Sequence, residues 1–429
     1  MQRLFSSDPD FAQAFDVLVN ARRESDADVS ADVARILADV KARGDEALAD
    51  YSQQFDGYQL SNDGDWVITA EACQEAYEGL DAELRDALEL AAERIRAYHA
   101  DQLPSNRDFT DDAGVRQGAI WRAVDAAGLY VPGGRAAYPS SLLMNAIPAK
   151  VAGVARLVVV TPTPHGNTNP LVLAAAHIAG VDEIWRVGGA QAVAALAYGT
   201  DRIAKVDVIT GPGNAWVAEA KRQLFGVVGI DMVAGPSEIL VIADKNNRAD
   251  WIAADLLSQS EHDPTSQSIL ITDDAGFADA VSEEVDAQLN ELATTETATA
   301  SWQANGAIII VDDLAEAAPL ADRLAAEHVE LAVAEPDTLL NTIRHAGSVF
   351  LGRMTPEAIG DYVAGPNHVL PTGRRARFAS GLSVLDFMKR TSFIALDDGS
   401  LAKIGPAAVS LAHAEGLPAH AKSVELRLK

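Results

Sequence analysis

The chain has 429 residues, 48% of them hydrophobic and 22% charged, a composition typical of a globular protein with a large buried core. Acidic residues outnumber basic residues by 62 to 34, which gives a formal net charge of −28. Because nucleic acids and anionic lipid surfaces would repel such a chain, we expect neither a nucleic-acid nor a membrane partner. The single cysteine, Cys73, excludes an intrachain disulfide and a zinc cluster of thiolates. The sequence also offers no apolar run of membrane-spanning length and no signal-peptide core, so we expect a cytoplasmic protein.

Residues 1–118 are predicted to form a mainly helical N-terminal region. Apolar residues recur at intervals of three and four in residues 29–55 and 81–103, and Asp81 is placed to cap the second of these helices. A short strand is expected at residues 66–69. Nothing in this region suggests chemistry, so we interpret it as architectural.

From residue 119 onward, strands rich in Val, Ile and Leu alternate with helices of about 10–15 residues, which is typical of parallel sheets covered on both faces. We therefore predict an α/β fold with two doubly wound, Rossmann-like domains at residues 119–237 and 238–375. Ligands of such domains usually bind at the carboxyl ends of the strands, so we expect the site in a crevice between two such edges. Residues 376–429 are predicted to form a C-terminal helical tail that docks on its own chain or reaches a neighbour. The predicted strands are 128–132, 156–162, 183–187 and 206–210 in the first domain, and 238–244, 268–272, 306–311, 329–335 and 347–352 in the second.

Three glycine-rich turns follow strands of the first domain: VPGGRAAYPSS, RVGGAQA and TGPGNAW. Such a turn, opening into a helix, can hold a nucleotide phosphate. None of the three spells the G-x-G-x-x-G fingerprint, and glycines that merely permit tight turns explain each one separately. The turns alone therefore leave a dinucleotide cofactor undecided.

The segment LLSQSEHDP, residues 256–264, is predicted to end an amphipathic helix with Asp250 as its N-cap. Gln259 and His262 lie three residues apart on one helical face, so their side chains can converge on a point. Nitrogen and oxygen donors of this kind suit a divalent metal or a polar substrate. A histidine at a helix end is more often a cap or a surface residue than a metal ligand, so this segment alone favours the structural interpretation.

Glu327 and His328 form an adjacent pair where a predicted helix meets a strand. A carboxylate beside an imidazole offers two general bases, but a solvated Glu and a His that favours the helix dipole explain the pair as well, and on these residues alone better. The stretch after residue 352 is rich in Gly and Pro, carries Asp361 and His368, and is predicted to be a long binding loop.

The remaining histidines carry less information. His177 lies in an apolar segment and is predicted to be packed, whereas the others are predicted to lie on the surface. The predicted surface histidines are His99, His165, His345 and His413.

Taken together, long runs of the sequence resemble the histidinol dehydrogenase family. They extend from Gly128 to the carboxyl end, and VKARGDEAL in the N-terminal region fits too. Departures are small: Val233 and Ser260 stand where proline and alanine are common. The matching runs are GLYVPGG, VGGAQAVAALAYGT, ITGPGNAWVAEAKRQ, DMVAGPSEILVIAD, DLLSQSEHDPTSQ, AEHVEL, GDYVAGPNHVLPT, SGLSVLDFMKR and AEGLPAHAKSVELR.

The resemblance implies one zinc ion per subunit, NAD as cofactor, and L-histidinol as the small-molecule substrate, oxidised in four electrons through bound L-histidinal to L-histidine in the last step of histidine biosynthesis. It implies a homodimer in which the C-terminal segment of one subunit completes the site of the other. The implied residues are Gln259, His262, Asp361 and His420 for zinc, Ser237, Gln259, His262, His328, Asp361, Glu415 and His420 for the substrate, Tyr130, Gln191 and Asn214 for NAD, and Glu327 and His328 for catalysis.

Two other functions stay open from the sequence. A paralogous zinc- and NAD-dependent dehydrogenase could act on another small polyol, such as a sulfonated propanediol, although the presence of Glu327, Glu415 and His420 favours histidinol. A zinc hydrolase would need no NAD, and the family's NAD-contacting positions, which include Tyr130 and Asn214, argue against it.

Overall fold

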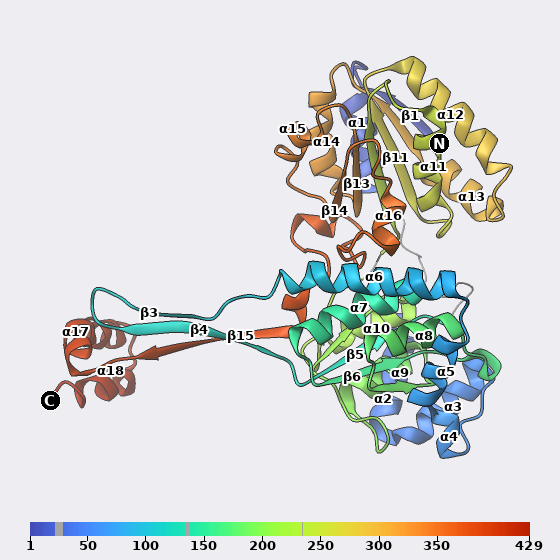
Figure 1. Cartoon of the computed structure of the whole chain (residues 1–429). Coiled ribbons are helices and arrows are strands. Elements are labelled where there is room, and N and C mark those ends of the chain that lie inside the picture. Colours follow the sequence, from blue (N-terminus) through green and yellow to red (C-terminus); the bar gives the residue numbers. More distant parts are fainter. Residues whose placement is uncertain (22–28, 134–137, 234) are drawn as a thin grey trace.

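The computed structural model describes residues 1–21, 29–133, 138–233 and 235–429. Two bodies, each built on a six-stranded sheet, lie one above the other in Figure 1, and a long arm projects sideways from them. The predicted α/β fold class with parallel sheets is confirmed.

The first sheet reverses its strand order next to β5, because the chain adds strands on one side of β5 and later on its other side. All of its strand pairs are parallel except that of β2 with β7. A reversal of this kind leaves a crevice at the carboxyl ends of the two central strands, here β5 and β8. The order across the sheet is β2 (Val67–Ile68), β7 (Glu183–Trp185), β6 (Arg156–Val160), β5 (Ala126–Tyr130), β8 (Val208–Thr210) and β9 (Gly229–Ile230).

Alternate residues of these strands enter two different cores. Leu157 and Val159 of β6 pack on one face, while Val158 and Val160 pack on the other, as the period of two in a strand requires. One face is covered by α5 (Ala70–Glu78), α6 (Ala82–Ala100), α7 (Pro139–Ala152) and α8 (Pro170–Ala179). The other is covered by α2 (Ser30–Arg43), α3 (Asp45–Asp56), α9 (Gly189–Tyr198) and α10 (Ala215–Leu224), and the short α4 (Asp63–Trp66) and η1 (Pro164–Gly166) lie in connections.

The second sheet is entirely parallel and reverses its order between β10 and β13. Its order is β1 (Gln2–Phe5), β12 (Ala307–Ile310), β11 (Gln267–Thr272), β10 (Glu238–Ala243), β13 (His328–Ala332) and β14 (Ser348–Leu351). The helices that flank it are α1 (Phe11–Asn20), α14 (Ala317–Leu324) and α15 (Pro336–Leu340) on one face, and α11 (Ala249–Ser260), α12 (Ala275–Leu289) and α13 (Thr295–Asn305) on the other, with η2 (Leu314–Glu316) before α14.

The arm is an antiparallel ribbon of β3 (Arg107–Thr110), β4 (Arg116–Ala123) and β15 (Met388–Ala395) that carries two helices at its far end (Figure 1). These helices are α17 (Asp398–Ala414) and α18 (Pro418–Glu425). Between the second sheet and the arm, the predicted binding loop contains α16 (Glu357–Tyr362), η3 (Arg375–Arg377) and η4 (Val384–Phe387).

The elements of residues 1–118 are shared among these parts. β1 and α1 belong to the second sheet, β2 and α2–α6 belong to the first, and β3 with the start of β4 belongs to the arm. The four-part division at residues 118, 237 and 375 stays a prediction. The predicted cap of α6 by Asp81 is confirmed, since its side chain accepts from the Leu84 backbone N–H at 2.9 Å. Among the described residues, no helix combines the length and apolar character needed to cross a membrane.

Candidate active site

Side chains that can do chemistry gather where β10 and β13 begin, at the reversal of the second sheet. His328 opens β13 opposite Ile239 of β10, and Glu327 and Ser237 directly precede these two strands. We predicted that the site lies between the carboxyl edges of the two sheets. In the second sheet these residues lie at the amino edge instead, so that prediction is wrong for this sheet. Glu327 and His328 lie where the chain runs from α14 into β13, and Ser237 lies where it enters β10, so these residues are at the amino edge of the sheet.

Hydrogen bonds to the backbone of Glu238 hold both candidate bases. The Glu238 backbone N–H donates to Glu327 Oε2 at 3.1 Å, and His328 Nδ1 donates to the Glu238 carbonyl oxygen at 3.0 Å. Because Nδ1 carries the proton in this arrangement, the lone pair of the neutral ring lies on Nε2. His328 Nε2 lies 3.5 Å from Glu357 Oε1, on α16.

Burial dominates the electrostatics of this cluster. It lowers the pKa of His328 to about 4, so the imidazole is neutral near neutral pH. Burial, followed by the charge of Glu238, raises the pKa of Glu327 well above its ordinary value. Burial and the nearby Asp361 raise the pKa of Glu357 to about 8. A neutral imidazole can accept a proton from a bound group, and a carboxyl of raised pKa is a strong proton acceptor once it is ionised.

Gln259 and His262 converge as predicted, although the helix that carries Gln259 starts earlier than predicted. Gln259 Nε2 donates to His262 Nδ1 at 3.2 Å. Gln259 Oε1 is buried and has no hydrogen-bond partner among the described residues. The N-cap of α11 is Arg248 instead of Asp250, whose carboxylate pairs with the Arg248 guanidinium.

Asp361 lies at the carboxyl end of α16, close to His328 and Glu357. His328, Glu357 and Asp361 each offer a ligand atom, and these atoms all lie within 4.8 Å of one another. This group shares only Asp361 with the zinc ligands expected from the resemblance.

His368 joins the two bodies at the site. Its Nδ1 donates to the Asp361 carbonyl oxygen at 3.0 Å, and its Nε2 contacts Ser141 Oγ of α7 at 3.2 Å. Burial lowers the pKa of His368. The amino edge of the second sheet thus meets the start of α7, the helix that follows β5 of the first sheet.

Two predictions about other histidines are wrong. His99 was expected on the surface but is fully buried, because it lies on the packed face of α6 together with Ile95. There its Nδ1 donates to the Ile95 carbonyl oxygen and its Nε2 accepts from Asn367 Nδ2 at 3.3 Å. His177 was expected to be packed but is exposed on α8, where its ring stacks on Tyr77.

The three residues expected to contact NAD lie at the carboxyl edge of the first sheet. Tyr130 ends β5, and its hydroxyl accepts from the Gly189 backbone N–H at 3.1 Å. Gln191 is buried in the first turn of α9, and Asn214 is the N-cap of α10. Because Asn214 Oδ1 accepts from the backbone N–H groups that follow it, its Nδ2 is the group that can meet a ligand.

Glu415 and His420 lie far from this cluster within the single chain. Both are exposed, at the junction of α17 and α18 on the end of the arm (Figure 1). One chain therefore brings together Gln259, His262, Asp361, Glu327 and His328, and it leaves Glu415 and His420 outside.

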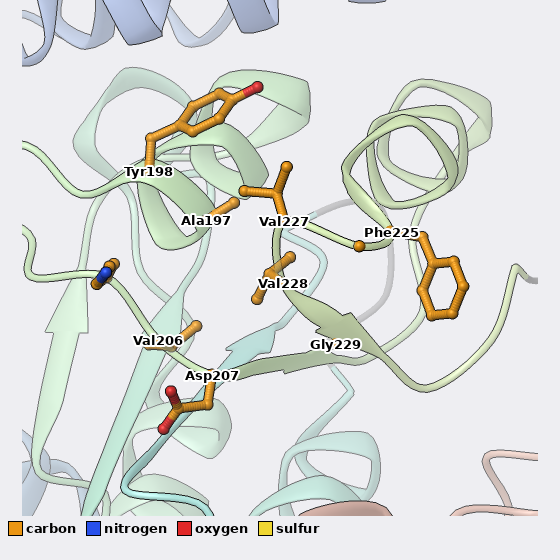
Figure 2. A pocket seen from close by; sticks show the side chains of 10 residues that line it. Ala197, Tyr198, Val206, Asp207, Phe225, Val227, Val228 and Gly229 are labelled. Carbon is orange, nitrogen blue, oxygen red and sulfur yellow. The ribbon is translucent and has the colours of Figure 1, made fainter. Parts of the chain in front are cut away.

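A shallow pocket of about 480 Å³ lies elsewhere, at the amino ends of β8 and β9 (Figure 2). Its lining includes Tyr198, Asp207 and Val228. It opens at the sheet edge opposite Tyr130 and Asn214, so it is separate from the cluster described above.

Sequence reasoning missed Glu357. It comes directly after Pro356 in a segment predicted to be irregular, and no local pattern distinguishes it from a surface glutamate. The signal that could have found it is its spacing: Glu357 precedes Asp361 by four residues, which places both on one face of a helix.

Comparison with known proteins agrees with these observations. The family model described as histidinol dehydrogenase matches residues 19–428. The chain is 64% identical over 426 residues to histidinol dehydrogenase of Zymomonas mobilis, covering 99% of both chains, and 62% identical over 432 residues to that of Rhodospirillum rubrum, covering 99% of this chain and 98% of the relative.

A solved structure of histidinol dehydrogenase from Elizabethkingia anophelis superposes with a TM-score of 0.95 at 34% identity, covering 100% of this chain and 98% of the other. The family's function is the NAD-dependent last step of histidine biosynthesis. The chain belongs to the histidinol dehydrogenase family.

Proposed function

We propose that the chain oxidises L-histidinol to L-histidine in two NAD-dependent steps through bound L-histidinal, with one zinc ion per subunit and active sites shared between two subunits. The observation that carries the proposal is the neutral, backbone-anchored His328 beside Glu327, placed next to the metal donors Gln259, His262 and Asp361.

The donor set fits zinc. Gln259 Oε1 is a buried acceptor without a partner among the described residues, and a cation would satisfy it. His262 Nδ1 already meets Gln259, which leaves Nε2 for a metal, and Asp361 adds a carboxylate. Nitrogen and oxygen donors of this type suit zinc. Bound there with His420 as a further ligand, zinc would hold the imidazole and amino groups of histidinol and orient its carbinol carbon.

His328 is the base of the first oxidation. Its Nε2 carries a free lone pair near neutral pH, so it accepts the hydroxyl proton of histidinol as the carbinol carbon gives up a hydride to NAD. The alcohol becomes an aldehyde, which stays in the site. The Glu238 carbonyl keeps the ring in the tautomer that this step requires.

Glu327 is the base of the second oxidation. Its raised pKa makes it a stronger proton acceptor than an exposed glutamate once it is ionised. It takes a proton from water as the water oxygen adds to the aldehyde carbon, and return of this proton to the former carbonyl oxygen gives a gem-diol. Loss of a second hydride to a second NAD, with loss of a proton, gives the carboxylic acid.

The cofactor is expected at the carboxyl edge of the first sheet. Tyr130, Gln191 and Asn214 come from three different elements and meet at the reversal point beside β5, which is where doubly wound sheets bind dinucleotides.

The arm supplies the argument for a shared site. Two residues that the family uses, Glu415 and His420, lie exposed at its far end, away from the other five residues. A second subunit whose arm crosses over would bring both residues to the cluster, as in an isologous dimer. We therefore expect an isolated monomer to be inactive.

The test is NADH absorbance with zinc-loaded protein, NAD and L-histidinol, combined with quantification of the product. Two NADH for each histidine formed would support the four-electron reaction. Absence of histidinol turnover by a zinc-loaded dimer would refute the proposal and direct the search to other small alcohols, such as a sulfonated propanediol.

A further inference from the structure

Lys221 and Asp231 form an ion pair in the interior of the first body. Their side chains are 3% and 1% exposed, and the Lys221 ammonium meets the Asp231 carboxylate directly. Lys221 lies on α10, and Asp231 follows β9. Taking two charges out of water costs free energy, so a buried pair is weak evidence for a role in stability alone.

Both charged groups also hold the same glycine. Lys221 Nζ donates to the Gly211 carbonyl oxygen at 3.0 Å, and Asp231 Oδ2 accepts from the Gly211 backbone N–H at 2.9 Å. Gly211 directly follows β8 and opens the turn GPGN, which ends at Asn214. Two side chains from different elements thus fix the backbone N–H and the carbonyl oxygen of Gly211.

This position tolerates glycine alone. Gly211 has φ +110°, and a Cβ there would lie 2.3 Å from the carbonyl oxygen of Tyr130. The turn therefore packs directly against the end of β5. Gly211 links two residues of the proposed cofactor site, because Tyr130 touches it and Asn214 ends the turn that it begins.

We propose that the Lys221–Asp231 pair positions the turn from Gly211 to Asn214, and through it the N-cap of α10, for binding NAD. The pair touches neither the metal donors nor the candidate bases, so its effect is expected in cofactor affinity. Lys221 and Asp231 are positioning residues. The inference rests on the cofactor site of the proposed function and adds the residues that hold that site in shape.

The test uses the full-length, zinc-loaded enzyme and three variants: Lys221→Met, the double variant Lys221→Met/Asp231→Asn, and the control Arg222→Met. Arg222 is the next residue of α10, is exposed, and pairs with Glu219 on the same helix. The measurements are the KM for NAD, the KM for histidinol, kcat, and the thermal unfolding midpoint.

Lys221→Met is expected to raise the KM for NAD about ten- to a hundredfold, because small displacements of a binding group have effects of this size, with little change in the KM for histidinol. It should also lower the unfolding midpoint, since Asp231 is left buried and unpaired. The double variant removes that charge and should recover stability, but not the affinity for NAD. Arg222→Met should behave as the wild type does.

An unchanged KM for NAD in folded Lys221→Met would overturn the inference. Recovery of the wild-type KM together with stability in the double variant would also overturn it, because the pair would then be purely structural. If Lys221→Met does not fold, the double variant decides. A wild-type enzyme that turns over histidinol without using NAD would refute the proposed function instead, so the two failures are distinguishable.

Discussion

Replacing Glu327 by Gln should separate the two oxidations. Gln has the same size, and its side-chain oxygen can accept the same hydrogen bond from the Glu238 backbone N–H. Burial already favours the uncharged form of residue 327, so a neutral amide should fold normally. The variant cannot accept a proton from water, however. Removing a general base typically costs about 10²- to 10⁴-fold in rate, which corresponds to about 2.7–5.4 kcal/mol in the activation free energy.

The assay compares L-histidinal and L-histidinol as substrates. Oxidation of the aldehyde should fall by the full factor, whereas formation of the first NADH from the alcohol should fall less than about tenfold, because His328 still accepts the hydroxyl proton. The exposed Glu335, at the N-cap of α15, offers the control Glu335→Gln, for which both rates should be those of the wild type. Equal losses in the two oxidations would refute the role assigned to Glu327.

Three further predictions concern the metal, the dimer and pH. His420→Ala should lose zinc on dialysis, as measured by atomic emission, and full retention of the metal would refute its role as a ligand. A verified heterodimer of inactive His328→Ala and inactive His420→Ala subunits should regain activity at one of its two sites, and a completely inactive heterodimer would argue against shared sites. Burial raises the pKa of Glu330 to about 9 and that of its neighbour Asp255 to about 6, so the folded state binds more protons than the unfolded state. Stability should therefore fall as pH rises from about 4.5 toward 9, and Glu330→Gln should flatten this decline in urea unfolding measured across that range; an unchanged slope would contradict the assignment.

The sheets were predictable because their signal is local. Buried parallel strands must be apolar on both faces, so runs such as that of β6 stand out in the sequence. β1 was not predicted, since an edge strand of four residues leaves two of them exposed and shows no apolar run. The arm was also not predicted as a ribbon, because β4 and β15 lie far apart in the sequence and their pairing leaves no local trace.

The candidate site was accessible from sequence only in part. The spacing of Gln259 and His262 predicted that their side chains converge, since helical geometry sets that distance. The partners of His328 could not be predicted in the same way: the Glu238 carbonyl and Glu357 reach it through the register of β10 with β13 and through the placement of α16. The ligand and catalytic roles carried over from the family remain predictions that the experiments above test.

The place of β1 has a consequence for how the chain is made. Residues 2–5 are made before their partner strand, which begins at residue 307, so β1 must wait while the strands of the first sheet are synthesised. During that time the sheet of the first body can form, because each of its strands is complete by residue 230. The second sheet gains an edge strand from residues made before the first sheet, and until it does so the edge of β12 stays open to pairing with other chains. Slowing translation between the two bodies should therefore lengthen the time for which β1 has no partner strand.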